Sequence, residues 1–327
     1  MEEIIFDEAF IEQLEQVQMG IALRLHEGMQ GGRRSSAKGS SLEFSDFREY
    51  GPGDDFRRID WAAYGRLDKL FIKIFMEEKE AVFNLFVDQS KSMAFGNPTK
   101  GKKSLQIVAA LSYMVMKHQD RVHIRLLGDN ASEDEQFEES QKLNHREVKD
   151  TEHKLSEQEN RKALRREITP RAGKQGFHEL LSQLQTAHFN GKMDIGEQIL
   201  KEPIRGKGVS IIVSDFLFPQ GLETLEKSLA YLSYKKQQAI LIQVLCKEER
   251  EPEETGDFEL IDSETNKVVR VTLNPKLLEA YKERFKAYQV ALQKLAQKYG
   301  AKYIAVDTEE SIEQIILKDF YHKQIIT

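Results

Sequence analysis

Cysteine is almost absent from the sequence. Cys246 is the single cysteine among 327 residues, which excludes an internal disulfide framework and a cysteine-rich zinc site. A lone thiol fits a reducing compartment. No apolar run reaches the roughly 18 residues of a membrane span, and the acidic start Met1-Glu2-Glu3 is not typical of a secretion signal. We therefore expect a cytoplasmic protein without direct membrane insertion, or one that is held at a membrane only through partners.

An excess of positive charge and the familiar hydrolase motifs are also missing. The net charge of -6 gives no general argument for a nucleic-acid partner. Neither G-x-S-x-G nor H-E-x-x-H occurs, so no motif indicates a serine or zinc hydrolase. With 40% hydrophobic and 31% charged residues, the chain can bury a core and keep a well-solvated surface. Its length suits one large or two ordinary domains.

A short apolar run at residues 82–87 is typical of a strand buried on both faces of a parallel sheet. Asp88, Ser90 and Ser92 follow it at alternate positions. The carboxyl end of a central parallel strand is where open α/β sheets bind ligands. Oxygen-bearing side chains can converge there on a hard cation such as Mg²⁺. The same residues can simply cap a helix, and the pattern alone leaves both interpretations open.

Strands and helices alternate from residue 81 onward, which predicts a doubly wound, mainly parallel α/β sheet. A hairpin is expected at 258–271 and a C-terminal helix from Thr308. The further strands are expected at 122–127, 209–216, 239–246 and 302–306, and the helices at 104–117, 177–184, 222–234 and 275–299. Asp215 ends one of these strands and would lie at the same sheet edge as Asp88 if the two strands are neighbours.

Residues 1–80 have a different character, and we expect them to form a separate, partly β subdomain. An amphipathic helix is predicted at 7–27 and a strand at 70–75. The small, basic run from Gly28 to Ser41 is either a mobile loop or a contact for an anion or an acidic partner. The charged segment 129–166 interrupts the later part of the chain and has too few large apolar residues to form a core of its own.

Acids and bases are interleaved around the only tryptophan. This block indicates a structural ion-pair network, or else paired carboxylates for acid–base work, although adjacent arginines would lower the pKa values of such acids. A turn at Gly51-Pro52-Gly53 opens the block. Its other members are Asp54, Asp55, Arg57, Arg58, Asp60 and Trp61.

Pro52-Gly-Asp-Asp55, Arg58-Ile-Asp-Trp61 and the Asp88-x-Ser-x-Ser motif together resemble the domain-of-unknown-function-58 family over nearly the whole chain. The resemblance implies a von Willebrand factor A-like domain at 81–327 behind an N-terminal subdomain at 1–80. It also implies a MoxR-type AAA+ ATPase as partner, in assembly or maturation of a protein complex. It also implies that Asp215 lies in the third of the loops that form the metal site.

Two departures from the family pattern stand out. The charged insertion 129–166 replaces a short connection. Met193 stands where the family usually has a threonine, and a thioether is a poor ligand for a hard cation. Asp194 is the nearest oxygen donor, but it is one position away and could instead cap the following helix. We therefore expect weaker Mg²⁺ binding than the family pattern implies.

These features favour a non-enzymatic protein-interaction module with a metal-ion-dependent adhesion-type site. One alternative is a Mg²⁺-dependent hydrolase that uses the same sheet edge. Another is a nucleotide binder at Gly96 to Lys103, which matches a phosphate loop up to Lys102. That match fails at Lys103, where a hydroxyl is needed, and Pro98 removes a backbone N–H that such a loop would use.

Overall fold

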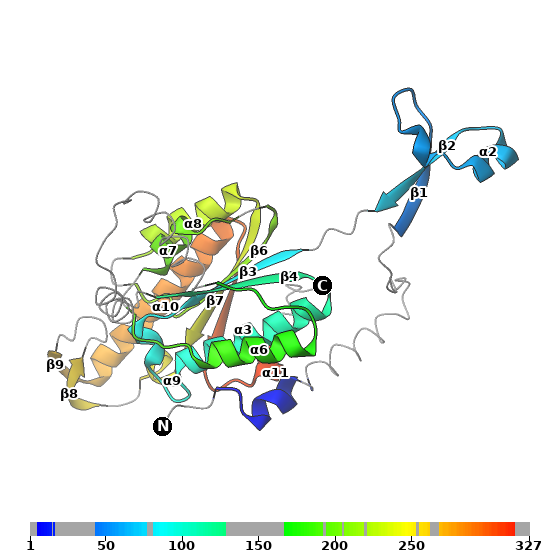
Figure 1. Ribbon diagram of the computed structural model, residues 1–327. Coiled ribbons are helices and arrows are strands. Elements are labelled where there is room, and N and C mark those ends of the chain that lie inside the picture. Colours follow the sequence, from blue (N-terminus) through cyan, green and yellow to red (C-terminus); the bar gives the residue numbers. More distant parts are fainter. Residues whose placement is uncertain are drawn as a thin grey trace, which may run out of the picture. The chain divides into compact units, whose positions relative to one another are not determined.

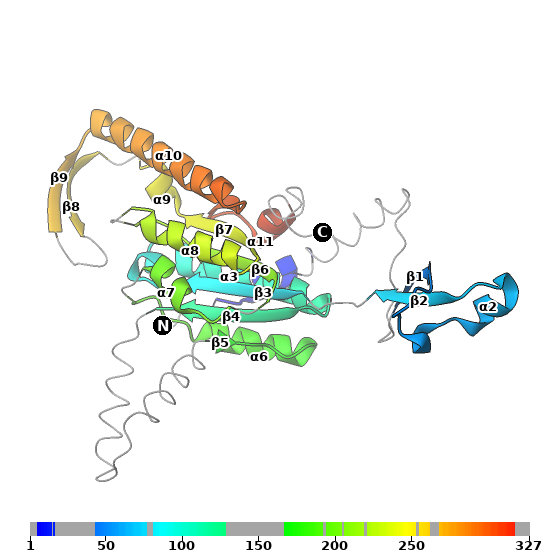
Figure 2. The same ribbon diagram turned by 90° about the horizontal axis from the view of Figure 1, so that it is seen from above.

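The structure is a computed structural model that describes residues 5–14, 16, 43–76, 81–128, 167–191, 194–204, 206–218, 221–252, 255–261 and 268–317. The chain forms two compact units. The larger unit contains residues 1–24 and 81–327, and the smaller contains residues 25–80. Figure 1 and Figure 2 show the elements of each unit. The predicted insertion 129–166 lies outside the described residues.

The larger unit is built on a six-stranded sheet in the order β10-β7-β6-β3-β4-β5, as far as the described residues go. All neighbouring strands are parallel except β5, which is an antiparallel edge strand. The order places β3 between β6 and β4, as the buried run at 82–87 predicted. The strands are β3 (Val82–Asp88), β4 (Arg121–Leu127), β5 (Glu167–Ile168), β6 (Gly208–Ser214), β7 (Gln237–Leu245) and β10 (Lys302–Asp307).

Helices cover both faces of this sheet, which gives the predicted doubly wound architecture (Figure 2). One face packs against α3 (Lys100–Lys117), α6 (Lys174–Gln185) and α11 (Ile312–Gln314). The other packs against α7 (Ile195–Lys201), α8 (Glu223–Tyr234) and α10 (Pro275–Lys298). Two short elements, η3 (Lys91–Ala94) and α9 (Lys247–Arg250), follow strands β3 and β7.

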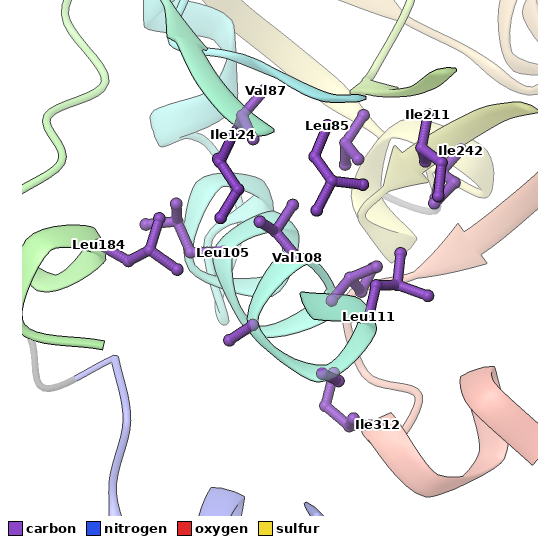
Figure 3. Close-up of a cluster of buried hydrophobic side chains, with 14 of the residues drawn as sticks. Leu85, Val87, Leu105, Val108, Leu111, Ile124, Leu184, Ile211, Ile242 and Ile312 are labelled. Carbon is purple, nitrogen blue, oxygen red and sulfur yellow. The ribbon is translucent and has the colours of Figure 1, made fainter. Parts of the chain in front are cut away.

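Side chains of β3 alternate between the two cores. Leu85 and Val87 lie in the core with α3 (Figure 3), while Phe86 lies in the core with α8. All three are fully buried. Each such side chain contributes about 1.5–3 kcal/mol through removal of apolar surface from water. Burial on both faces explains why the sequence of this strand is continuously apolar.

The N-terminal helix belongs to the larger unit, which differs from the prediction that residues 1–80 form one subdomain, whereas the boundary after residue 80 agrees with it. Residues 8–14 are helical, and Phe10 and Leu14 are buried in the core with α3. The backbone carbonyl of Ile5 also accepts a hydrogen bond from the Gln106 side chain at 2.9 Å. The apolar stripe of this helix thus covers α3 and does not serve a separate subdomain. The rest of the predicted helix at 7–27 lies outside the described residues, apart from residue 16.

The smaller unit contains an antiparallel pair of strands, β1 (Glu43–Glu49) and β2 (Phe71–Met76). The second of these is the strand predicted at 70–75. Between them lie η2 (Phe56–Arg58) and a helix that the sequence did not predict, α2 (Trp61–Leu67). The unit is therefore partly β, as expected.

The C-terminal part agrees with most of the predicted elements. Strands β8 (Gly256–Ile261) and β9 (Val268–Leu273) form the expected antiparallel hairpin. The last described helix begins at Ile312 and not at Thr308, because Ser311 accepts the backbone N–H of Gln314 and caps it. Among the described helices, none is both long and apolar enough to cross a membrane.

Candidate functional site

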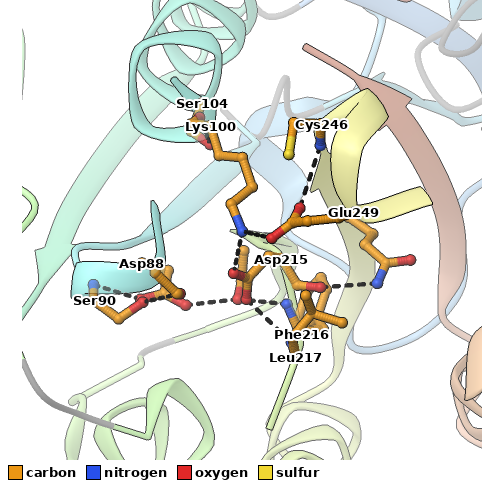
Figure 4. Close-up of polar contacts among 12 residues, drawn as sticks. Asp88, Ser90, Lys100, Ser104, Asp215, Phe216, Leu217, Cys246 and Glu249 are labelled. Atoms are coloured by element: carbon orange, nitrogen blue, oxygen red, sulfur yellow. Dashed lines mark hydrogen bonds and ion pairs between the residues drawn. The ribbon is translucent and has the colours of Figure 1, made fainter. Parts of the chain in front are cut away.

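The loop after β3 brings two hydroxyls together at the carboxyl edge of the sheet; Figure 4 shows one of them, on Ser90, beside Asp88. The Oγ atoms of Ser90 and Ser92 lie 3.0 Å apart. The loop is fixed by Asp88, whose Oδ1 accepts the backbone N–H of Ser90 at 2.8 Å. Ser90 also pairs with Gly191 as an isolated bridge, so the loop around Gly191 lies beside it. Three of the predicted metal ligands, Asp88, Ser90 and Ser92, are therefore neighbours in space.

Asp88 is almost completely buried, and its carboxylate meets two opposing effects. The hydroxyl of Ser214 donates to its Oδ2 at 2.6 Å, which favours the ionised form. Burial and the nearby charge of Asp215 act against ionisation and outweigh the hydrogen bonds. They raise the pKa of Asp88 from 3.8 to about 6. A positive charge at this edge would relieve that penalty.

Asp215 lies at the same edge because β3 and β6 are adjacent and parallel. Its Oδ1 accepts the backbone N–H of Leu217 at 3.1 Å. Its Oδ2 accepts from the Nζ of Lys100 at 2.7 Å. Lys100 also donates to the Oε1 of Glu249 at 2.5 Å, so one ammonium ion lies between two carboxylates (Figure 4).

Three members of this site were missed by the sequence analysis. Ser214 directly precedes Asp215, so a hydroxyl–carboxylate pair at the end of a strand was the available signal. Lys100 gives no local signal, because a lysine at the start of a helix is ordinarily solvated. Glu249 is 149 residues from Lys100 in sequence, and only the fold brings the two together.

Asp194 does not contribute a free carboxylate. It precedes α7, and its Oδ1 accepts the backbone N–H groups of Gly196 at 2.8 Å and Glu197 at 3.3 Å. Its Oδ2 accepts the hydroxyl of Thr224 at 2.7 Å. Asp194 therefore caps α7, as one of the two interpretations of the sequence proposed. Met193 lies outside the described residues.

The hydroxyl pair and Asp88 fit a small hard cation. Oxygens at adjacent corners of an Mg²⁺ octahedron with bonds of about 2.1 Å are roughly 3.0 Å apart, which equals the Oγ–Oγ distance of Ser90 and Ser92. The described residues contain no cluster of three His, Cys, Asp or Glu side chains that could hold a metal. A cation here would thus use two hydroxyls and one carboxylate, with water in the remaining positions and Asp215 nearby.

The segment Gly96 to Lys103 does not form a phosphate loop. Helix α3 already begins at Lys100, with the Thr99 hydroxyl accepting the backbone N–H of Lys102. Gly101 is packed so closely on the ring of Phe189 that a Cβ would lie 2.5 Å from it. Gly101 and Lys102 are therefore part of the first helical turn and cannot wrap around a phosphate.

The carboxylates of the 52–61 block are used for structure. Asp54 accepts the backbone N–H of Gly51 at 2.9 Å and pairs with Arg48 at 2.7 Å. These contacts, the backbone bond first, lower the pKa of Asp54. Asp55 caps η2, and Asp60 caps α2 by accepting from Ala62 and Ala63. Pro52 and Gly53 form the turn, where Gly53 has φ of 104°, and the side chain of Arg58 lies outside the described part of the chain.

The smaller unit also exposes large aromatic side chains. Phe56 and Trp61 are each 65% exposed, and Phe47 and Tyr64 are exposed as well. The rings of Trp61 and Tyr64 meet edge to face, with centroids 6.3 Å apart. Exposed Trp, Tyr and Phe are enriched in protein interfaces. We call these four residues the exposed aromatics.

Comparisons with known sequences identify one matching family. The model of the family described as "Protein of unknown function DUF58" matches residues 46–291. The chain is 23% identical over 301 residues to "Uncharacterized protein Rv1480" of Mycobacterium tuberculosis (strain ATCC 25618 / H37Rv). It has the same identity to "Uncharacterized protein Mb1516" of Mycobacterium bovis. Each alignment covers 90% of this chain and 84% of the relative.

Three solved structures are similar to the chain. The conserved hypothetical protein BatB from Bacteroides thetaiotaomicron has a TM-score of 0.39 at 14% identity, covering 75% of this chain and 100% of its own. An aerotolerance-related membrane protein from Bacteroides fragilis has 0.38 at 15%, covering 74% and 99%. The SpRpn10 VWA domain has 0.35 at 8%, covering 73% and 94%.

Proposed function

Because the chain belongs to the family described as "Protein of unknown function DUF58", we propose a function from the geometry of its own residues. We infer that the protein is a non-enzymatic interaction module that takes a divalent cation, Mg²⁺ in the cell, at the carboxyl edge of its sheet. A protein partner then binds this cation through an acidic side chain. The observation that carries the proposal is the hydroxyl pair of Ser90 and Ser92, 3.0 Å apart beside a buried carboxylate.

The charge and chemistry of the donors give the cation its role. Ser90, Ser92 and Asp88 would hold the ion with a single negative charge, so the bound ion would remain strongly electrophilic. Mg²⁺ keeps several water molecules in its shell when the protein supplies few ligands. A carboxylate from a partner is the group that would replace one of them most favourably. The cation thereby serves as a charged bridge between two proteins.

We propose a MoxR-type AAA+ ATPase as the partner, as the sequence resemblance implies. The exposed aromatics of the smaller unit offer a second contact surface. Phe56 and Trp61 would each bury a large apolar area against the partner. Buried aromatic side chains of this kind commonly contribute most of the binding free energy. The proposed complex thus uses an ionic contact in one unit and an aromatic contact in the other.

Metal-dependent hydrolysis would need a positioned nucleophile or base in addition to the ion. The polar groups placed next to the donors are already engaged, since Ser214 donates to Asp88 and Lys100 donates to Asp215 and Glu249. The interaction module is therefore the better conclusion. A phosphate-release assay with purified protein separates the two, because the module produces no phosphate from nucleotide or phosphoester substrates.

Thermal unfolding in the presence of metal tests the cation site. Millimolar Mg²⁺ or Mn²⁺ should raise the melting temperature of the wild type, since a ligand that binds only the folded state stabilises it by mass action. The double substitution S90A/S92A should abolish this rise. Ser112→Ala is the matched control, because Ser112 is also a buried serine but lies on α3, three turns beyond Lys100. An equal rise in wild type and S90A/S92A would overturn the proposed site.

A further inference from the structure

Lys100 is a buried cation inside the candidate cation site. Its side chain is 1% exposed, and it lies at the first position of α3. The two carboxylates that it contacts come from different parts of the fold. Asp215 follows β6, and Glu249 lies on α9 after β7. An ammonium ion this deep is stable only because it is paired.

The contact with Asp215 competes directly with metal binding. The Oδ2 of Asp215 accepts from Lys100, and its Oδ1 accepts a backbone N–H, so both oxygens already have donors. An ammonium and a metal ion near the same carboxylate also repel each other strongly in a buried setting. A divalent cation held by Ser90 and Ser92 therefore gains little from Asp215 while the lysine stays in place.

Glu249 keeps the lysine in this position. Its Oε1 accepts from Lys100, and its Oε2 accepts the backbone N–H of Cys246 at 3.3 Å, so the carboxylate also bonds to the start of α9. Its backbone carbonyl accepts the hydroxyl of Tyr281 at 2.7 Å, which links α9 to α10. Glu249 is the more exposed of the two carboxylates, at 16% against 3%.

We propose that the Lys100 ammonium competes with the divalent cation for Asp215, and that Glu249 holds the ammonium at Asp215. Tight cation binding then requires the ammonium to leave Asp215. This inference rests on the proposed function and adds its regulation. Asp88, Asp215 and Glu249 together carry three negative charges when all are ionised, and Lys100 neutralises one of them. The site thus retains an attraction for a divalent ion, which the lysine weakens and does not abolish.

Calorimetric titration with Mn²⁺ tests the competition. Lys100→Met should bind Mn²⁺ with a dissociation constant at least about tenfold lower than that of the wild type, because a positive charge next to the ion is removed. The matched control is Lys103→Met. Lys103 is likewise a buried lysine on α3, but it donates to the backbone carbonyl of Glu310 at 2.6 Å. This control should bind Mn²⁺ as the wild type does.

A second variant separates competition from net charge and protects against misfolding. K100M/E249Q removes one positive and one negative charge, so the net charge of the cluster is unchanged and Asp215 is left without a lysine. It should also bind Mn²⁺ more tightly than the wild type. If the wild type binds Mn²⁺ and folded K100M and K100M/E249Q bind it no more tightly, the competition is refuted while the proposed site stands. If none of the proteins binds Mn²⁺, both the site and the competition are refuted.

Discussion

Asn in place of Asp88 should make the protein more stable at pH 7 without metal, although it removes a central residue of the candidate site. The pKa of Asp88 is raised from 3.8 in the unfolded chain to about 6 in the folded protein. The folded state therefore binds the proton more tightly than the unfolded state. This protonation contributes stability that is fully present below about pH 3.8 and is lost as the pH rises through about 6.

The magnitude follows from the shift in pKa. Each pKa unit corresponds to about 1.4 kcal/mol, so ionised Asp88 costs about 3 kcal/mol above pH 6. Asparagine avoids this cost and still accepts from the Ser90 backbone, but it disturbs the bond from Ser214, worth about 1 kcal/mol. The net gain at pH 7 should be about 1–2 kcal/mol, or roughly 2–8 °C in melting temperature for a unit of this size.

Urea unfolding of both proteins in EDTA, at intervals from pH 4 to pH 7.5, measures this difference. Asp88→Asn should be slightly less stable than the wild type at pH 4, where the lost Ser214 bond outweighs the small electrostatic gain, and should become more stable than the wild type as the pH rises through 6. Millimolar Mg²⁺ should then stabilise the wild type and leave the variant unchanged. Asp194→Asn is the control, because asparagine caps helices about as well as aspartate. A variant less stable than the wild type at pH 7 in EDTA would refute the electrostatic reasoning.

Three further predictions concern other parts of the chain. The double substitution F56A/W61A should weaken capture of the partner in a pull-down and leave the melting temperature within a few degrees, because both side chains are largely exposed; a collapse of folding would show that they are core residues. Asp60→Ala should cost about 1 kcal/mol in a urea titration, since it removes the cap of α2, whereas no loss would mean that the cap is not needed. Deletion of residues 133–165 should change the melting temperature by only a few degrees, and loss of the cooperative transition would contradict the prediction that they carry no core.

Much of the fold was predictable because burial leaves a strong signature in parallel strands. All residues of the run at 82–87 are apolar except Asn84, as suits a strand buried on both faces. The run forms the central strand β3. The same reasoning placed Asp88 and Asp215 at one edge, since carboxyl ends of adjacent parallel strands lie together. Local patterns were also enough for the long helix α10, which begins at Pro275 after the capping residue Asn274.

The rest depended on contacts between distant segments. No local pattern shows that Lys100 turns inward to Asp215, because a lysine at the start of a helix is ordinarily solvated. The N-terminal helix carries an apolar stripe that any neighbouring surface could cover, and only the packing of Phe10 in the core with α3 identifies that surface. For Asp194, the sequence left capping and metal binding open, and only the structure shows that its carboxylate caps α7 through bonds to Gly196 and Glu197.

The central claim is that a cation held at the sheet edge recruits a protein partner. Its most direct test is a pull-down from the native cell with wild-type protein and S90A/S92A, in Mg²⁺ and in EDTA, followed by mass spectrometry. We predict that wild-type protein captures an AAA+ ATPase of MoxR type in Mg²⁺, and that both EDTA and S90A/S92A remove this ATPase. Equal capture under all four conditions, or capture without any AAA+ ATPase, would contradict the account.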